Sequence, residues 1–137
     1  MILVDSTVWI DLLRANRTAP ATVLERLLEL GEVATAPVIV QEILQGARNA
    51  AGFLRLRARL LALPMLDPRP GAASHAAAAY LYARCRWAGI TPRSPHDCLI
   101  AAIAIEHGIA LLHDDRDFEA LATIEPRLHL VTCLPAQ

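Results

Sequence analysis

Lysine is absent from this 137-residue sequence, whose 13 basic residues are all arginines and are nearly balanced by 14 acidic residues. Mechanisms that need a lysine are therefore excluded, which removes Walker-type phosphate binding, Schiff-base catalysis and the receiver-type phosphoacceptor site. Because the net charge is only -1, any attraction for nucleic acid must come from a local patch of the surface.

Cysteine is scarce as well. The three cysteines, Cys85, Cys98 and Cys133, are odd in number, lie far apart and include no Cys-x-x-Cys pair. This spacing suggests neither a disulfide framework nor a thiolate zinc site. We interpret all three as buried free thiols.

Long apolar runs are missing too. No run approaches the roughly 20 residues that cross a bilayer, and the amino terminus lacks a basic stretch followed by an apolar core. We therefore expect a soluble cytoplasmic protein without membrane contact. Hydrophobic residues make up 55% of the chain and aromatic residues only 4%, and much of the excess is alanine. This composition suits one compact domain of packed helices over residues 1–137.

Strand-like and helix-like apolar patterns alternate along the chain. Short apolar runs predict strands at 2–4, 32–36, 65–66, 109–112 and 128–132. Helical spacing is found between them, with no hairpin signal, which implies crossover connections and a mostly parallel sheet. We predict an α/β fold with three layers, α/β/α, and a central sheet of four or five strands.

Asp5 stands directly after the first predicted strand, and Ser6 or Thr7 can cap the helix that follows. Ligands of open parallel sheets bind beyond the carboxyl ends of the strands, so Asp5 occupies a position suited to chemistry. Taken alone, an aspartate here can equally serve only as a helix cap.

Three other acids occupy comparable positions. Asp115 follows a predicted strand, Asp97 lies in the first turn of a helix, and Glu42 faces inward from an apolar helix segment. All of them can point toward Asp5 at one end of the sheet. Four such carboxylates repel each other unless a cation neutralises them, and oxygen ligands favour magnesium or manganese over zinc. The pattern therefore predicts metal-assisted hydrolysis of a phosphodiester.

Each acid also has a purely structural interpretation. Asp97 can be a partner of the helix dipole, and Asp115 with Asp117 can form a turn before a short helix. Leucines alternate with arginines after residue 50, a pattern typical of a solvated helix face but also able to grip a phosphate backbone. The arginines concerned are Arg48, Arg55, Arg57, Arg59 and Arg69.

Four segments carry a family resemblance in the correct order and spacing: Val4–Asp11, Gln41–Gly46, Ser94–Ala102 and Leu111–Phe118. Together they resemble the motifs of PIN domains, specifically those of VapC-type toxins. The resemblance implies an Mg²⁺- or Mn²⁺-dependent endoribonuclease that hydrolyses phosphodiester bonds in RNA. It also implies a homodimer held inactive by a VapB-type antitoxin.

The resemblance assigns roles by position. It makes Asp5, Glu42, Asp97 and Asp115 the catalytic and metal-binding quartet, with small hydroxyl supports at Ser6, Thr7 and Ser94 and a water-mediated metal contact at Asp117. Such sequences more often have an uncharged residue at position 114, so Asp114, Asp115 and Asp117 are alternatives for the loop acid nearest the metal. The resemblance further places the antitoxin in a groove near the first helices.

We expect that groove to involve Trp9, Leu12, Leu13 and the stretch Leu56–Leu61. The alternative function is a catalytically silent PIN-like scaffold that binds only protein. No acid of the quartet is missing from the sequence to support that alternative.

Overall fold

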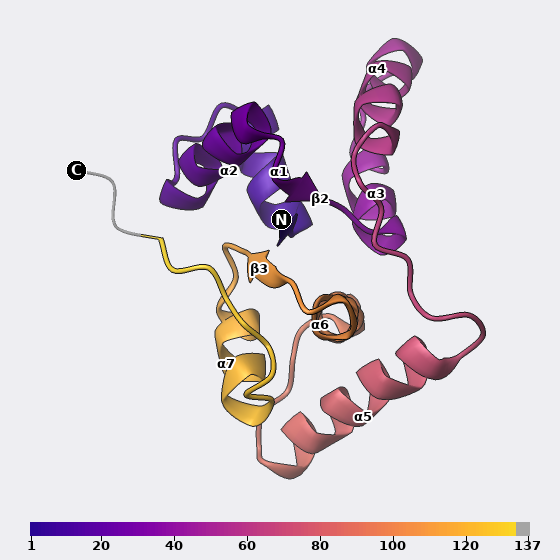
Figure 1. Ribbon diagram of the computed structural model, residues 1–137, viewed down its shortest axis with the longest axis vertical. Coiled ribbons are helices and arrows are strands. Elements are labelled where there is room, and N and C mark those ends of the chain that lie inside the picture. Colours follow the sequence, from indigo (N-terminus) through magenta and orange to yellow (C-terminus); the bar gives the residue numbers. More distant parts are fainter. Residues whose placement is uncertain (134–137) are drawn as a thin grey trace.

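The computed structural model describes residues 1–133 (Figure 1). Its centre is a three-stranded parallel sheet in the order β2-β1-β3, with β1 at Ile2–Val4, β2 at Val33–Ala34 and β3 at Ala110–Leu112. In the middle of the sheet Leu3 pairs with Ala34 on one side and Leu111 on the other. All three strands end at the same edge, because they run parallel.

The prediction of four or five strands is wrong for the described residues, which contain three. Met65 and Leu130 each form only a single parallel bridge, to Thr35 and Leu111 respectively. Pro64 precedes Met65 and Pro68 follows soon after, and proline supplies no backbone donor to extend a ladder. The segment around Leu130 pairs with β3, which is itself only three residues long.

Within residues 1–133, seven helices surround the sheet, as the alternating pattern predicted. They are α1 Ser6–Leu13, α2 Ala19–Leu30, α3 Pro37–Leu44, α4 Ala50–Leu61, α5 Ala73–Trp87, α6 Pro95–His107 and α7 Arg116–Ile124. In Figure 1 the strands lie between α1 and α2, above, and α6 and α7, below, while α3 and α4 extend at the upper right. Several helix starts follow the capping signals: Thr18, Asn49 and Ser94 each accept a hydrogen bond from a first-turn N–H.

Helix α6 is the most buried helix of the fold. Its buried residues fall on every side and include Cys98, Ile100 and Ile103, since it packs against α5, α7, α3 and β3. Gly108, in the left-handed conformation at φ 63°, ends the helix. In its first turn Pro95 and His96 are exposed, whereas Asp97 and Cys98 are buried, so Asp97 points toward the interior.

The thiol and membrane predictions can be compared with the structure. Cys85 and Cys98 are buried free thiols, as expected, whereas Cys133 is only half-buried.

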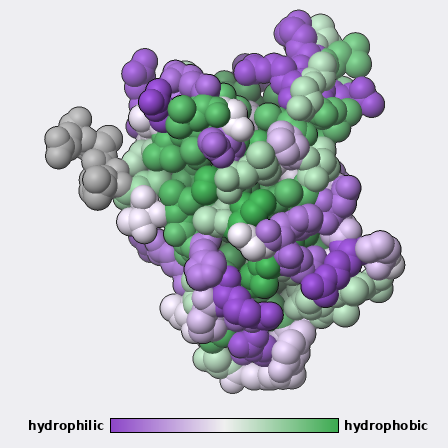
Figure 2. Space-filling view, viewed as in Figure 1, coloured by the Kyte–Doolittle hydropathy of each residue, from purple (hydrophilic) through white to green (hydrophobic). Residues whose placement is uncertain are grey.

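Within residues 1–133, no helix combines the length and hydropathy required to span a membrane. Figure 2 shows hydrophobic residues gathered over the middle of one face, with hydrophilic residues around them.

The two phenylalanines provide a matched test of the core. Phe118 of α7 is completely buried, whereas Phe53 of α4 is 37% exposed. We expect Phe118→Ala to lower the free energy of unfolding by about 3–5 kcal/mol because it opens a cavity. Phe53→Ala should cost less than about 1 kcal/mol. Urea denaturation of both variants measures the difference, and equal losses would contradict this placement of α7.

Candidate functional site

Asp5 is the first acid at the carboxyl edge of the sheet. Its side chain is 2% exposed and accepts hydrogen bonds from the Thr7 hydroxyl at 2.6 Å and the Thr7 N–H at 3.2 Å. Asp5 is itself the N-cap of α1, so the prediction that Ser6 or Thr7 caps this helix is wrong. Burial raises the pKa of Asp5 despite the bonds from Thr7, and repulsion from Asp115 adds to the rise.

Glu42 approaches the same edge from α3. The Ser6 hydroxyl donates to its Oε1 at 3.4 Å, and His96 Nδ1 lies 3.7 Å from its Oε2. Burial and the charge of Asp5 raise the pKa of Glu42, whereas His96 and Ser6 act in the opposite direction. Ser6 therefore supports Glu42, and Thr7 supports Asp5.

Asp97 is the most perturbed acid of the site. It is 7% exposed in the first turn of α6, where Ser94 caps the helix by accepting the His96 N–H at 3.2 Å. Burial, followed by repulsion from Asp5 and other nearby acids, raises its pKa to about 7. A carboxylate that served only the helix dipole would have a lowered pKa, so burial, together with the repulsion from the neighbouring acids, outweighs the helix dipole here.

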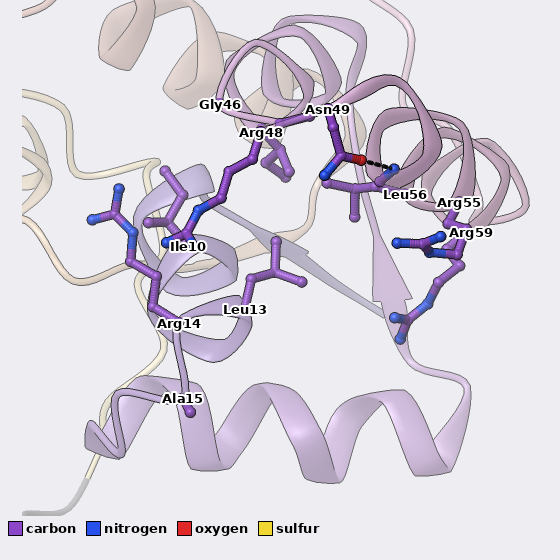
Figure 3. Close-up of a pocket in the computed structure, with 13 residues that line it drawn as sticks. Ile10, Leu13, Arg14, Ala15, Gly46, Arg48, Asn49, Arg55, Leu56 and Arg59 are labelled. Atoms are coloured by element: carbon purple, nitrogen blue, oxygen red, sulfur yellow. Dashed lines mark hydrogen bonds between the residues drawn. The ribbon is translucent and has the colours of Figure 1, made fainter.

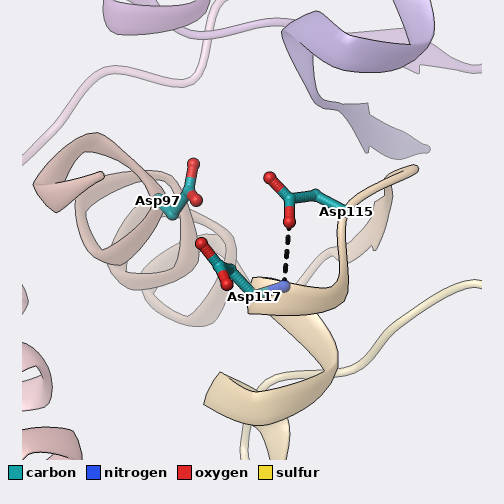
Figure 4. A group of neighbouring side chains, drawn as sticks. All are labelled: Asp97, Asp115 and Asp117. Carbon is teal, nitrogen blue, oxygen red and sulfur yellow. Dashed lines mark hydrogen bonds between the residues drawn. The ribbon is translucent and has the colours of Figure 1, made fainter. Parts of the chain in front are cut away.

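The loop between β3 and α7 supplies two more acids. Asp115 is the N-cap of α7 and accepts the Asp117 N–H at 2.9 Å. Asp97, Asp115 and Asp117 each place a carboxylate oxygen within 4.8 Å of the others (Figure 4). Asp5 and Glu42 are not members of this tight group, although the charge of each raises the pKa of Asp97.

Asp114 is oriented away from this group. Burial of Asp114, followed by a side-chain hydrogen bond with Asp11, raises its pKa. Its own N–H donates to the Thr7 hydroxyl at 3.4 Å. Of the three candidate loop acids, Asp115 and Asp117 are therefore the two that face Asp97.

Arg93 is a site residue that the sequence analysis missed. Its side chain is 75% exposed, and its guanidinium pairs with Asp115 at 2.8 Å and Asp117 at 3.2 Å. These two partners raise the pKa of Arg93, with the hydrogen bond to Asp117 contributing most. One signal was available: Arg93 stands immediately before Ser94, the cap of the helix that carries Asp97.

A groove of about 730 Å³ lies between α1 and the α3–α4 pair (Figure 3). Apolar side chains line part of it, and arginines surround them (Figure 3). The apolar lining residues are Ile10, Leu13, Ile43 and Leu56, and the arginines are Arg14, Arg48, Arg55 and Arg59. A cationic and apolar groove is suited to an acidic, amphipathic partner segment.

The groove differs in detail from its prediction. Leu13 and Leu56 line it as expected, but Trp9 is 5% exposed and Leu60 is fully buried, so both belong to the core. Arg57 is not among its lining residues. Arg69 lies at a separate cavity, with its Nε 4.0 Å from Glu106.

The donor set is suited to a hard divalent cation. Asp97, Asp115 and Asp117 offer three closely spaced oxygens, which are ligands that magnesium and manganese accept and zinc does not prefer. The raised pKa of Asp97 shows that burial and repulsion from the neighbouring acids both disfavour its charged form. A bound cation would relieve that repulsion, so the residues present fit a metal ion.

Comparison with known proteins relates the chain to a family. The PIN domain model matches residues 2–124. Ribonuclease VapC11 from Mycobacterium tuberculosis is 40% identical over 126 residues, covering 90% of this chain and 93% of that protein. Ribonuclease VapC51 from the same organism is 32% identical over 111 residues, covering 81% of this chain and 80% of that protein.

Solved structures share the fold. VapBC2 from Rickettsia felis, bound to a DNA fragment from its promoter, aligns with a TM-score of 0.72 and 17% identity over 96% of this chain and 98% of that chain. FitAcB from Neisseria gonorrhoeae aligns with a TM-score of 0.68 and 21% identity over 96% of this chain and 97% of that chain.

The raised pKa of Asp97 predicts a pH dependence of stability. Between its ordinary pKa of 3.8 and about 7, the folded state holds a proton that the unfolded state has lost. The free energy of unfolding of the metal-free protein should therefore fall as the pH rises through this window. Asp97→Asn should be more stable than the parent protein at pH 8, by about 1 kcal/mol or more, with the gain shrinking toward pH 5.

Urea denaturation in the presence of a chelator, at pH 5 and pH 8, measures this effect. Asp67→Asn is the matched control, because Asp67 is exposed and lies outside the acid group. If Asp97→Asn lowered stability at both pH values, Asp97 would be a helix-dipole partner and nothing more.

Proposed function

Since this chain belongs to the PIN-domain family, we propose that it is an endoribonuclease toxin whose activity a cognate antitoxin holds in check. The observation that carries the enzymatic part is the convergence of Asp97, Asp115 and Asp117 within 4.8 Å at the carboxyl edge of the sheet. The ribonuclease names of VapC11 and VapC51 support the reaction. The complexes among the structural neighbours support the antitoxin partner.

Asp97 and Asp115 are the proposed direct ligands of a divalent metal, with Asp5 and Glu42 completing the quartet and Asp117 contributing directly or through water. Magnesium is the proposed ion, and manganese is its substitute in assays. A cation bound there would neutralise charge on the phosphodiester and lower the pKa of a water molecule. Asp97 must lose its proton for such binding, so we expect metal affinity to fall below about pH 7.

The side chains around the acids keep them in place for this role. Thr7 fixes Asp5, Ser6 and His96 contact Glu42, and Ser94 begins the helix that carries Asp97. In the proposed hydrolysis, water oxygen bonds to phosphorus, the bond from phosphorus to the 3′ oxygen breaks, and that oxygen takes up a proton. The products are a 5′-phosphate and a 3′-hydroxyl.

RNA cleavage tests this proposal directly. Incubation with total RNA and manganese should give fragments that carry 5′-phosphates, and a chelator should abolish the cleavage. Asp97→Asn should lower the rate by at least about 100-fold, because it removes a proposed ligand, whereas Asp67→Asn should not change it. Fragments ending in a 2′,3′-cyclic phosphate would overturn the assignment, and intact RNA would favour the silent scaffold.

The arginine-lined groove is the proposed binding site of the antitoxin. Its arginines complement acidic residues, and Leu13, Ile43 and Leu56 provide an apolar floor for a helix or extended segment. Ile43 is the sequence neighbour of Glu42, so a segment in the groove would lie beside the acid site. Occupation of the groove therefore offers a route to inhibition.

A homodimer is the proposed assembly of the isolated chain. Tyr80 and Trp87 of α5 are 60% and 75% exposed, and their rings contact edge to face with centroids 6.3 Å apart. Two large aromatic side chains seven residues apart share one face of the helix. Exposed aromatic pairs of this kind are enriched at protein interfaces.

Light scattering coupled to size-exclusion chromatography tests the dimer. At about 50 µM we expect twice the mass of one chain, since an interface of ordinary size gives micromolar affinity or better. Trp87→Glu should shift the protein toward monomer by burying a charge at that interface. Leu30→Glu is the control on α2, where Leu30 is 55% exposed. A monomeric parent protein would contradict the proposed assembly.

A further inference from the structure

Arg93 lies in the connection between α5 and α6, where its side chain is exposed. It nevertheless forms three hydrogen bonds with Asp115 and Asp117, at the start of α7. Its Nη2 donates to Asp115 Oδ1 at 2.8 Å, and its Nε donates to Asp117 Oδ2 at 3.2 Å. Its backbone N–H also donates to Asp117 Oδ2, at 3.0 Å. The start of α7 is thereby joined to the residue that precedes the cap of α6.

These bonds use one oxygen of each carboxylate and leave the other free. Asp115 Oδ1 accepts both Arg93 and the Asp117 N–H, and Asp117 Oδ2 accepts two bonds from Arg93. Among residues 1–133, the hydrogen bonds of these two side chains do not involve Asp115 Oδ2 or Asp117 Oδ1. Figure 4 shows the second oxygen of Asp115 directed toward Asp97.

We propose that Arg93 is a positioning residue for the metal ligands. It holds the outer oxygens of Asp115 and Asp117, so that their inner oxygens face Asp97 and receive the cation. This inference rests on the proposed function, because it assigns Arg93 a role toward the same metal site. Arginine suits the task, since its planar fork bonds two carboxylates at once, whereas the ammonium of lysine is a point donor.

The opposite role would be competition, with the guanidinium occupying the place of the cation. A competitor must bond the oxygens that the metal needs. Arg93 instead approaches from the solvent side, with a 75% exposed side chain. Its guanidinium bonds Asp115 Oδ1, which also accepts the Asp117 N–H, and Asp117 Oδ2, which also accepts the backbone N–H of Arg93 itself. The inner oxygens are the ones available to the metal, so the geometry favours positioning.

Manganese titration calorimetry at pH 8, with the metal alone as ligand, separates the two roles. Arg93→Met should raise the dissociation constant for manganese about tenfold or more, because the outer hydrogen bonds that orient the ligands are lost. The dissociation constant of Arg93→Lys should lie closer to that of Arg93→Met than to that of the parent protein, since a lysine ammonium lacks the planar fork that aligns one donor with each acid. Arg116→Met is the matched control, because Arg116 is exposed beside Asp115 and forms no hydrogen bond with the side chains of the acid group within residues 1–133.

The control removes the same charge at nearly the same place and should change manganese affinity less than about threefold. RNA cleavage provides a second measurement, because saturating manganese should restore most of the activity of Arg93→Met. A loss that arose from misfolding would not recover. Melting curves without metal identify any such misfolding, and Arg93→Lys keeps the charge should Arg93→Met fail to fold.

Affinity of Arg93→Met equal to or tighter than that of Arg116→Met would overturn the positioning role. Failure of the proposed function has a different signature: the parent protein would neither bind manganese nor cleave RNA. A parent protein that does both, beside an Arg93→Met variant with unchanged affinity, would leave the function standing and remove only the role of Arg93.

Discussion

Repulsion among carboxylates at one edge of a small parallel sheet is the constraint on which this site depends. Burial raises the pKa of Asp5, Glu42 and Asp97, and the charges of the neighbouring acids add to the effect. Neighbouring side chains stabilise part of this negative charge. Thr7 donates a hydrogen bond to Asp5, and Arg93 pairs with Asp115 and Asp117. Among the described residues, the negative charge of Asp97 has no such partner, and its pKa stays raised. A cation is therefore the ligand that suits this site.

The fold tolerates this cluster because the surrounding core is rigid and apolar. Helix α6 has buried residues on every side, and the fully buried Phe118 anchors α7 directly after Asp117. Destabilised groups at functional sites are commonly offset by stability elsewhere in a protein. A sheet of only three short strands is sufficient here, since its task is to align the β1 and β3 ends that carry Asp5 and the loop acids.

Helix α3 joins the two surfaces of interest. Glu42 faces the acids, and the next residue, Ile43, lines the groove beside α4. The acid site and the arginine-lined groove carry opposite charge although the chain as a whole is nearly neutral. Separation of charge within one small molecule lets each surface select a different class of partner.

Local chemistry in the sequence determined the seven helices of residues 1–133, the N-caps of α2, α4 and α6 and the placement of acids after strands, because these depend on neighbours within a few residues. Tertiary structure alone decided which loop acid faces Asp97, since Asp114 turns toward Asp11, more than 100 residues earlier in the chain. It also decided that Leu60 belongs to the core and that Arg93 pairs with acids 22 and 24 residues away. Such contacts depend on how helices pack across the sheet, and the hydrophobic pattern of a single segment carries no information about that packing.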